Sequence, residues 1–234
     1  MFTFKQFTVN DSRTAMKVGV DSVLLGAWMD LSGAHRLLDA GCGCGILALM
    51  AAQRLAGTEF RIDAIDIESG AVADAAGNYA ASPWGAHLSA RLVSLQDFAD
   101  EAAPCSYDHI FINPPYYDDS PASASAERDT ARSTATLSRR DILFAAAKIL
   151  TGRGRLSLIL PFDQGKKMIL EASLFGWYLT RQCFVKTKKG ALPKRLMLEF
   201  SPEAPSRLET ETLVIGDERY RELTSGFYLY RDAL

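Results

Sequence analysis

A short apolar run that stops at two consecutive prolines places the strongest constraint on how this chain can fold. The run 110–112 is typical of a buried strand, and Asn113-Pro114-Pro115-Tyr116 follows it directly. Neither proline has an N–H group to donate, so the strand ends at Asn113, and Pro114 disfavours helical backbone angles there. This stiff turn presents an amide, a carbonyl and an aromatic ring at the C-terminal end of a strand, where open α/β sheets bind ligands.

An exocyclic amine on a flat ring is the substrate that such a turn suits. The Asn113 side-chain oxygen and the Pro114 carbonyl can both accept hydrogen bonds from one NH2 group, which localises a lone pair that the ring otherwise delocalises. Tyr116 can stack on the ring, a contact worth about 1–3 kcal/mol for a nucleobase. On these four residues alone, a proline-rich loop without a ligand is an open alternative.

Length and composition favour one α/β domain, with small additions at most. The chain has 234 residues, of which 48% are hydrophobic, and a formal net charge of -2, so any nucleic-acid site must be local. The spacing of the four cysteines fits neither disulfides nor a zinc site, so we expect a reducing, cytoplasmic location and no metal. The N-terminus lacks the apolar core of a signal peptide, and no run approaches the roughly 20 apolar residues of a membrane span.

A glycine-rich loop follows the first predicted strand, at residues 37–40. The sequence from Asp39 to Gly45 has the pattern D-x-G-x-G-x-G, with glycines at Gly41, Gly43 and Gly45, and not the G-x-G-x-x-G of dinucleotide-binding proteins. Glycine permits positive φ and close approach of a ligand to the backbone. The carboxylate of Asp39 would repel a pyrophosphate but attract an ammonium group, so a cofactor with an amino-acid head fits better than NAD. A glycine-rich structural turn is the alternative.

Acidic residues also follow the next two predicted strands. The strand 61–66 ends in Asp66, at the position from which an acid binds ribose hydroxyls, and Glu68 is a second candidate for that role. A third strand is expected at 88–95, followed by Asp97 and Phe98, which could bind an adenine amine and stack on its ring. A solvated loop aspartate is the alternative for Asp97.

The second half of the chain predicts the other side of the sheet. We expect a helix at 137–150, a strand at 156–160, a helix at 164–175 and an antiparallel pair at 179–187 and 196–200. The polar segment 118–136, which contains Arg128 and Arg132, is expected to be a lid beside the site. Six basic residues without an acidic one lie between Tyr178 and Leu198: Arg181, Lys186, Lys188, Lys189, Lys194 and Arg195.

The ordered set of the glycine loop, Asp66, Asp97 and the Asn113–Tyr116 turn resembles the class I S-adenosylmethionine-dependent methyltransferases that modify an amine with an N-P-P-Y motif. The resemblance implies a Rossmann-like α/β fold with a seven-stranded, mostly parallel sheet, an antiparallel last hairpin and flanking helices. It also implies that Gly41, Gly43 and Gly45 approach the cofactor, that Asp66 holds its ribose, and that Asp97 and Phe98 face its adenine.

A narrower resemblance covers nearly the whole chain. The stretch 4–7, the stretches 16–21 and 24–28, Ala131-Arg132 and the stretch 227–229 resemble the bacterial tRNA(Val) adenine-N6 methyltransferases. That family implies methylation of the adenine beside the anticodon and places Lys17 and Asp21 near the methionine end of the cofactor. We therefore expect one methyltransferase domain, with a cofactor-lid segment at 1–34, a catalytic core at 35–200 and a C-terminal extension at 201–234.

The predicted reaction is direct transfer of the sulfonium methyl group to adenine N6, without a general base, so the three histidines need no catalytic role. Lys186, Lys188, Lys189, Lys194 and Arg195 are expected to bind the phosphates of the tRNA anticodon arm, with a solvated hairpin as the alternative. A monomer or weak dimer is expected. The other activities considered are a protein-glutamine methyltransferase of the release-factor type, a DNA adenine methyltransferase and a cofactor-binding protein without catalysis.

Overall fold

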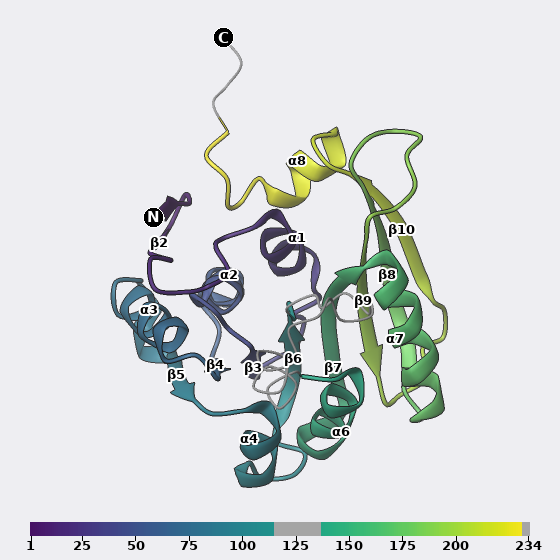
Figure 1. The fold of residues 1–234 in the computed structure, drawn as a ribbon, viewed down its shortest axis with the longest axis horizontal. Helices are drawn as coiled ribbons and strands as arrows, with labels where there is room; N and C mark the ends of the chain where they lie inside the picture. The colour runs from purple at the N-terminus through teal and green to yellow at the C-terminus, as the bar shows by residue number, and fades with distance from the viewer. Residues whose placement is uncertain (115–136, 231–234) are drawn as a thin grey trace, which may run out of the picture.

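A computed structural model of the protein describes residues 1–114 and 137–230 and shows a large, mostly parallel sheet between two layers of helices (Figure 1). Pro115, Tyr116, Arg128, Arg132 and the expected lid at 118–136 lie outside the described residues.

The main sheet has eight strands in the described part of the chain, in the order β10-β8-β9-β7-β6-β3-β4-β5. Its strands are β3 (Arg36–Ala40), β4 (Arg61–Asp66), β5 (Leu88–Leu92), β6 (Tyr107–Ile112), β7 (Leu150–Pro161), β8 (Tyr178–Lys186), β9 (Arg195–Ser201) and β10 (Glu209–Val214). Strand β9 is antiparallel to β7 and β8, and the other neighbours are parallel. The predicted fold is confirmed, and β10 adds an eighth strand to the expected seven.

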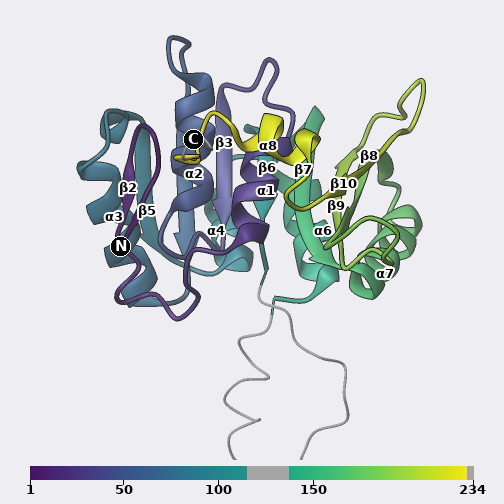
Figure 2. The ribbon, with the colours of Figure 1, turned by 90° about the horizontal axis from the view of Figure 1, so that it is seen from above.

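Helices cover both faces of this sheet (Figures 1 and 2). They are α1 (Val20–Trp28), α2 (Ile46–Leu55), α3 (Ser69–Ala80), η1 (Gly85–His87), α4 (Leu95–Glu101), α6 (Arg139–Ile149), α7 (Phe162–Leu174) and α8 (Glu218–Thr224). A separate two-stranded sheet joins β1 (Phe2–Thr3) to β2 (Thr8–Val9). No helix in residues 1–114 and 137–230 has the length and apolar character needed to span a membrane.

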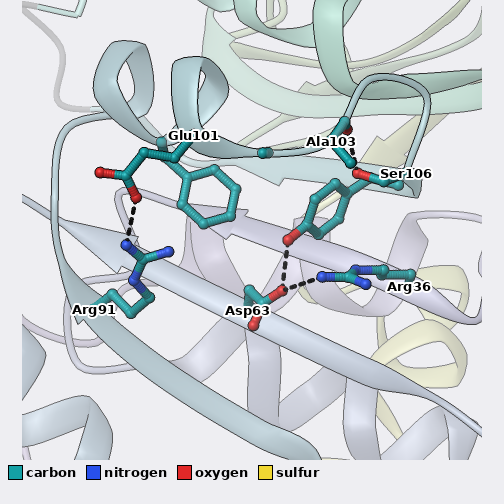
Figure 3. Close-up of a pocket in the computed structure, with 9 residues that line it drawn as sticks. Arg36, Asp63, Arg91, Glu101, Ala103 and Ser106 are labelled. Carbon is teal, nitrogen blue, oxygen red and sulfur yellow. Dashed lines mark hydrogen bonds and ion pairs between the residues drawn. The ribbon is translucent and has the colours of Figure 1, made fainter.

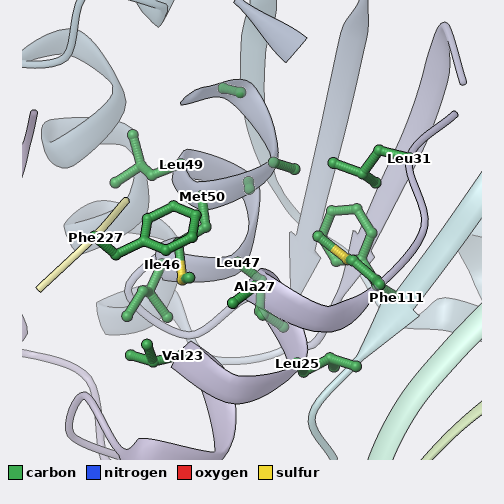
Figure 4. Close-up of a cluster of buried hydrophobic side chains, with 14 of the residues drawn as sticks. Val23, Leu25, Ala27, Leu31, Ile46, Leu47, Leu49, Met50, Phe111 and Phe227 are labelled. Carbon is green, nitrogen blue, oxygen red and sulfur yellow. The ribbon is translucent and has the colours of Figure 1, made fainter. Parts of the chain in front are cut away.

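Two hydrophobic cores form because successive residues of a buried strand face opposite sides of the sheet. Leu37 and Phe111 belong to the core under α1 and α2, whereas their neighbours Leu38 and Ile110 belong to the core under α4 and α6. Figure 4 shows how closely α1 and α2 pack in the first core. A Cβ atom on Gly26 of α1 would lie 2.7 Å from the sulfur of Met50 in α2, so a larger residue there would require the Met50 side chain to shift.

The parallel register brings the C-terminal ends of the central strands to one edge of the sheet. Asp39 of β3 pairs with Ala64 of β4 and with Phe111 of β6, so the residues that follow these strands lie side by side. Strand β9 runs in the opposite direction, and Arg195 at its start pairs with Pro161 at the end of β7. The β8–β9 hairpin therefore projects from the same edge as the glycine loop and Asn113, which we call the ligand edge.

The end of the third strand differs from its prediction. The third strand ends at Leu92 and not at residue 95, because Ser94 caps helix α4 by accepting a hydrogen bond from the Asp97 N–H group. Helix α1 begins after Gly19 without a side-chain cap. Ser138 caps helix α6, with Asp141 completing a capping box.

Candidate active site

The glycine loop lies between the ends of β3 and β4 and is held by backbone hydrogen bonds. The N–H groups of Gly41 and Cys42 donate to the carbonyl of Ile65, at 2.8 and 2.9 Å. Gly43 has φ of 54° and Gly45 has φ of 81°, as the glycine pattern predicted, since side chains disfavour this region. The loop is thus fixed without any bound molecule.

Asp39 is the buried acid beneath this loop. It is 0% exposed, and its Oδ2 accepts a hydrogen bond from the Ala48 N–H group at 3.1 Å, whereas its Oδ1 has no partner among the described residues. Burial, reinforced by the charge of Asp66, raises the pKa of Asp39 to about 8. A buried carboxyl group with an unmatched oxygen is suited to receive a cation, and an ammonium group would restore its ordinary ionised state.

Asp66 connects β4 to the glycine loop. Its Oδ2 accepts from the Gly43 N–H group at 2.9 Å, and its Oδ1 accepts from the Glu68 N–H group at 2.9 Å. A carboxylate can accept about four hydrogen bonds, so both oxygens keep capacity for ribose hydroxyls. Glu68 is exposed and occupies the N-cap position of α3 without a side-chain capping bond.

Asp97 and Phe98 have different environments, although they are neighbours. Asp97 is at the start of α4 on the ligand edge, where its Oδ2 accepts from the Ser94 hydroxyl at 2.7 Å. The Phe98 side chain is 3% exposed and packs in the core between Tyr107 and the guanidinium of Arg91. The expectation that the Phe98 ring stacks on adenine is therefore corrected, because helix α4 turns that ring into the core.

Asn113 directly follows β6 at the same edge. Its Nδ2 donates a hydrogen bond to the hydroxyl of Ser22, in the first turn of α1, at 2.8 Å. The Pro114 side chain is buried, which fixes the backbone beyond the strand. The described half of the predicted tetrapeptide thus stands where the sequence placed it, at the C-terminal end of a central strand.

Residues 10–14, within the segment 1–34 that was expected to be a cofactor lid, form a wall beside the glycine loop through contacts that the sequence did not reveal. The buried Asp74 of α3 accepts three hydrogen bonds in its Oδ2, from the Arg13 N–H, the Thr14 N–H and the Thr14 hydroxyl, at 2.8–3.0 Å. Asn78 of α3 bonds to the backbone of Asn10 and to the carbonyl of Cys44 in the glycine loop. The methyl group of Thr14 stands against Gly43, 3.5 Å from the place of an added Cβ.

Lys17 and Asp21 lie close to this wall but bind within the protein. The Lys17 ammonium donates to the backbone carbonyls of Asp11, Ser12 and Thr14. Asp21 forms an ion pair with Arg195, with a distance of 2.8 Å between the Asp21 Oδ2 and the Arg195 Nε. Arg195 was expected to bind RNA and Asp21 to lie near the cofactor. Because the two side chains form an ion pair with each other, the charge of each is offset by the other.

The remaining basic residues of the β8–β9 hairpin divide into two groups. Arg181 lies under α1, where it stacks on Trp28 and pairs with Glu199 and Glu209. Lys188, Lys189 and Lys194 are exposed, and Lys186 is half-buried, on the part of the hairpin that projects from the ligand edge.

A cavity of about 320 Å³ opens elsewhere, on the face of the sheet beside α4 (Figure 3). Its arginines are paired, Arg36 with Asp63 at 3.7 Å and Arg91 with Glu101 at 2.7 Å. Of the predicted site residues in the described ranges, only Phe98 lines it, so this cavity is separate from the ligand edge. No cluster of three or more potential metal ligands occurs in the part of the chain that the structure describes.

Comparisons with known proteins agree with this geometry. The model of the methyltransferase small domain family matches residues 14–182. The chain is 42% identical to a tRNA1(Val) (adenine(37)-N6)-methyltransferase from Tolumonas auensis, over 99% of this chain and 98% of that protein. It is 38% identical to a protein with the same name from Escherichia coli O157:H7, over 98% of this chain and 95% of the relative.

Solved structures with low sequence identity show the same fold. A predicted O-methyltransferase from Agrobacterium tumefaciens superimposes with a TM-score of 0.65 at 17% identity, covering 88% of this chain and 96% of that one. A putative RNA methyltransferase from Pyrococcus horikoshii gives a TM-score of 0.55 at 16% identity, covering 84% and 91%. These likenesses concern the arrangement of the sheet and its helices.

Proposed function

The chain belongs to the family of tRNA1(Val) (adenine(37)-N6)-methyltransferases, within the methyltransferase small domain family, and we propose that it methylates N6 of adenosine 37 in tRNA1(Val) with S-adenosylmethionine as donor. The observation that carries this proposal is the meeting of Asp39, Asp66 and Asn113 at one edge of the sheet. These residues match a cofactor with an ammonium and a ribose beside a substrate with a planar amine.

The residues present fit S-adenosylmethionine, which supplies the methyl group when it is bound. The unmatched Oδ1 of Asp39 is suited to the ammonium of the amino-acid head, and Gly41 leaves the backbone open to close approach, since an added Cβ there would meet nothing within 4 Å. Asp66 would bind the ribose hydroxyls, with Glu68 beside it, and Asp97 would accept from the adenine amine. We no longer assign a stacking role to Phe98, and we infer that Lys17 and Asp21 shape the methionine end through their contacts within the protein.

Asn113 and Pro114 would hold the acceptor. The Asn113 Oδ1 and the Pro114 carbonyl would each accept one hydrogen bond from the N6 amine, which localises the nitrogen lone pair. Tyr116 would stack on the adenine. The amine can lose its proton after transfer, so no histidine is required, and the ring nitrogens of His35 and His87 form hydrogen bonds with backbone carbonyls.

The tRNA would lie across the ligand edge. Lys186, Lys188, Lys189 and Lys194 project there and would pair with phosphates of the anticodon arm, and Arg128 and Arg132 remain predictions for the same partner. An anticodon-loop base is unstacked more easily than a base in a duplex, which suits a site on an open edge. A cytoplasmic location, as the cysteines predicted, fits this substrate.

The test uses two transcripts of tRNA1(Val), one with adenosine at position 37 and one with guanosine there. The purified protein and labelled S-adenosylmethionine are incubated with each, and the nucleosides are analysed by mass spectrometry after digestion. N6-methyladenosine should form only in the first transcript. Label in neither transcript, or equal label in both, would overturn the assigned position. The relatives do not favour the protein-glutamine and DNA alternatives.

A further inference from the structure

Helix α1 is a rigid support that carries two polar residues to the ligand edge. Residues 23–28 are all buried, and the helix packs against α2 (Figure 4). Gly26 faces the Met50 side chain in this contact. Such packing leaves little freedom for the helix to shift relative to the sheet. Its first turn therefore holds Asp21 and Ser22 at fixed positions.

These two residues contact different elements of the ligand edge. Asp21 pairs with Arg195 at the start of β9, at 2.8 Å, and both side chains are partly buried. Ser22 accepts a hydrogen bond from the Asn113 amide, also at 2.8 Å. The partners are 174 and 91 residues away in the sequence, so α1 connects the base of the hairpin to the end of β6.

The Asn113 amide turns its nitrogen, and not its oxygen, toward the Ser22 hydroxyl. A side-chain amide has a donor on one side and an acceptor on the other, and only the oxygen can accept from a substrate amine. With its nitrogen directed at Ser22, the Asn113 amide directs its oxygen away from α1. The inverted amide would present N–H groups to an N6 amine, which would oppose binding of the acceptor.

We propose that Ser22 is a positioning residue that sets the orientation of the Asn113 amide, and that the Asp21–Arg195 ion pair holds the first turn of α1 in place for this purpose. The inference rests on the proposed function for its chemistry, since it explains how an amine acceptor meets an oxygen. The inference assigns Asp21 and Arg195 a shared role in holding α1, which is distinct from binding the cofactor or the tRNA directly.

The kinetic test compares four variants on the adenosine-37 transcript. Ser22→Ala should lower kcat about 5- to 10-fold, the worth of one neutral hydrogen bond, with the affinities for S-adenosylmethionine and tRNA unchanged. Ser22→Thr keeps the hydroxyl and should restore most of the rate. Asp21→Asn should lower kcat about 2- to 4-fold, because the ion pair is partly exposed. The matched control is Arg91→Gln, which breaks an ion pair of 2.7 Å with Glu101 in the cavity beside α4 and should leave kcat unchanged.

A double-mutant cycle separates positioning from general damage. If Ser22 acts through Asn113, Ser22→Ala should cost nothing further in an Asn113→Ala background. An equal loss in both backgrounds, or full activity of Ser22→Ala alone, would overturn the inference.

A measurement without substrate tests the contact independently of the proposed function. The side-chain NH2 signals of Asn113 in ¹⁵N-labelled protein are identified by their loss in Asn113→Ala. They should shift and exchange faster with solvent in Ser22→Ala, but not in Ser22→Thr or Arg91→Gln. Unchanged signals in Ser22→Ala would overturn the inference even in an active enzyme, whereas shifted signals in a protein that fails on tRNA would reject only the proposed substrate.

Discussion

Two groups of polar residues, buried or partly buried, lie on the same sheet, and they differ in their positions along the strands. Asp39, Asp66 and Asn113 lie at the C-terminal ends of β3, β4 and β6. His109, Ser157 and Glu199 lie within β6, β7 and β9 under α1, where they are 0%, 0% and 2% exposed. The second group has the residue types of a hydrolytic triad, with His109 Nε2 2.8 Å from the Ser157 hydroxyl, which donates to Glu199 at 2.9 Å.

Burial alone therefore does not identify a functional group. The second group is sealed from solvent, buried beside the hydrophobic core under α1 and α2. Glu199 forms an ion pair with Arg181 at 3.5 Å. Burial raises the pKa of Asp39 to about 8 and lowers the pKa of His109 to about 3, because both groups lose solvation of the charged form. Only Asp39 lies where a ligand can replace the lost solvation.

The largest difference between the groups should appear in catalysis. Asn113→Ala should reduce methyl transfer by about 10²-fold or more, by analogy with the loss of one preorganised polar contact, and leave S-adenosylmethionine affinity nearly unchanged. Ser157→Ala in the sealed group should lower stability but not kcat. Single-turnover kinetics on the folded variants would measure the rate of methyl transfer in each. Comparable rates for Asn113→Ala and wild type would reject the assigned role.

Cofactor affinity provides the next comparison. Asp39→Asn keeps the shape of the side chain but removes its charge, so the dissociation constant of S-adenosylmethionine should rise about 10- to 100-fold, the worth of a hydrogen bond between charged groups. Calorimetric titration would measure it. His109→Gln, which alters the sealed group, should leave this affinity unchanged, and wild-type affinity in Asp39→Asn would exclude a contact with the ammonium.

The two groups should also affect stability with opposite dependence on pH. The folded-state pKa of Asp39, about 8, exceeds its ordinary 3.8, so the folded state binds more protons between these values and stability falls as pH rises. The folded-state pKa of His109, about 3, is below its ordinary 6.5, so stability falls as pH decreases through that window.

Urea unfolding without cofactor would measure these slopes, which reach about 1.4 kcal/mol per pH unit for one group, or tenfold in the folded ratio. The stability of Asp39→Asn relative to wild type should increase as pH rises from 4 to about 8. The relative stability of His109→Gln should increase as pH falls from about 7 to 4. Parallel profiles for the two variants would contradict the assigned pKa shifts.

The sequence predicted the ligand edge because its signals are local. Two prolines follow β6, glycines mark the turn after β3, and β4 ends in an aspartate, so each of these elements can be recognised from its own residues. The prediction was wrong for Phe98 because the sequence did not show where α4 begins. Ser94 starts that helix three residues before Asp97, and the helix directs Phe98 inward.

The residues that orient the site were missed because they act over long distances in the chain. Ser22 contacts Asn113 across 91 residues, and Asp74 contacts Thr14 across 60. A serine in an apolar helix and an aspartate in an alanine-rich one carry no pattern that indicates a partner. Only the folded arrangement of α1 and α3 identifies them.

The projecting lysines test whether the ligand edge extends to the β8–β9 hairpin. Lys188→Glu with Lys189→Glu should weaken tRNA binding about 5- to 10-fold and flatten its salt dependence, since fewer counterions are released. The control reverses two exposed charges at the opposite edge, Arg153→Glu with Arg207→Glu, and should have little effect. Filter binding over a range of salt concentrations would measure both. Equal losses in the two double variants would point to net charge and not to the hairpin.

The smallest expected effect separates the wall of the site from an ordinary loop anchor. Asp74 and Asp108 both hold backbone N–H groups, Asp74 those of Arg13 and Thr14 beside the glycine loop, and Asp108 those of His35 and Arg36 at the far edge. Each alanine variant should destabilise the protein, and Asp74→Ala more so, because the hydrogen bonds to Asp74 are buried or partly buried whereas those to Asp108 are exposed.

Only Asp74→Ala should also raise the dissociation constant of S-adenosylmethionine, by about 3- to 5-fold. Without the hydrogen bonds to Asp74, residues 10–14 are less ordered, and part of the binding free energy is then spent on ordering them. Asp74→Asn retains an acceptor oxygen and should recover part of this loss. If Asp108→Ala weakened cofactor binding equally, the effect would come from general destabilisation. A loss confined to Asp74 would show that the N-terminal segment is a wall of the cofactor site, which the strand ends alone do not complete.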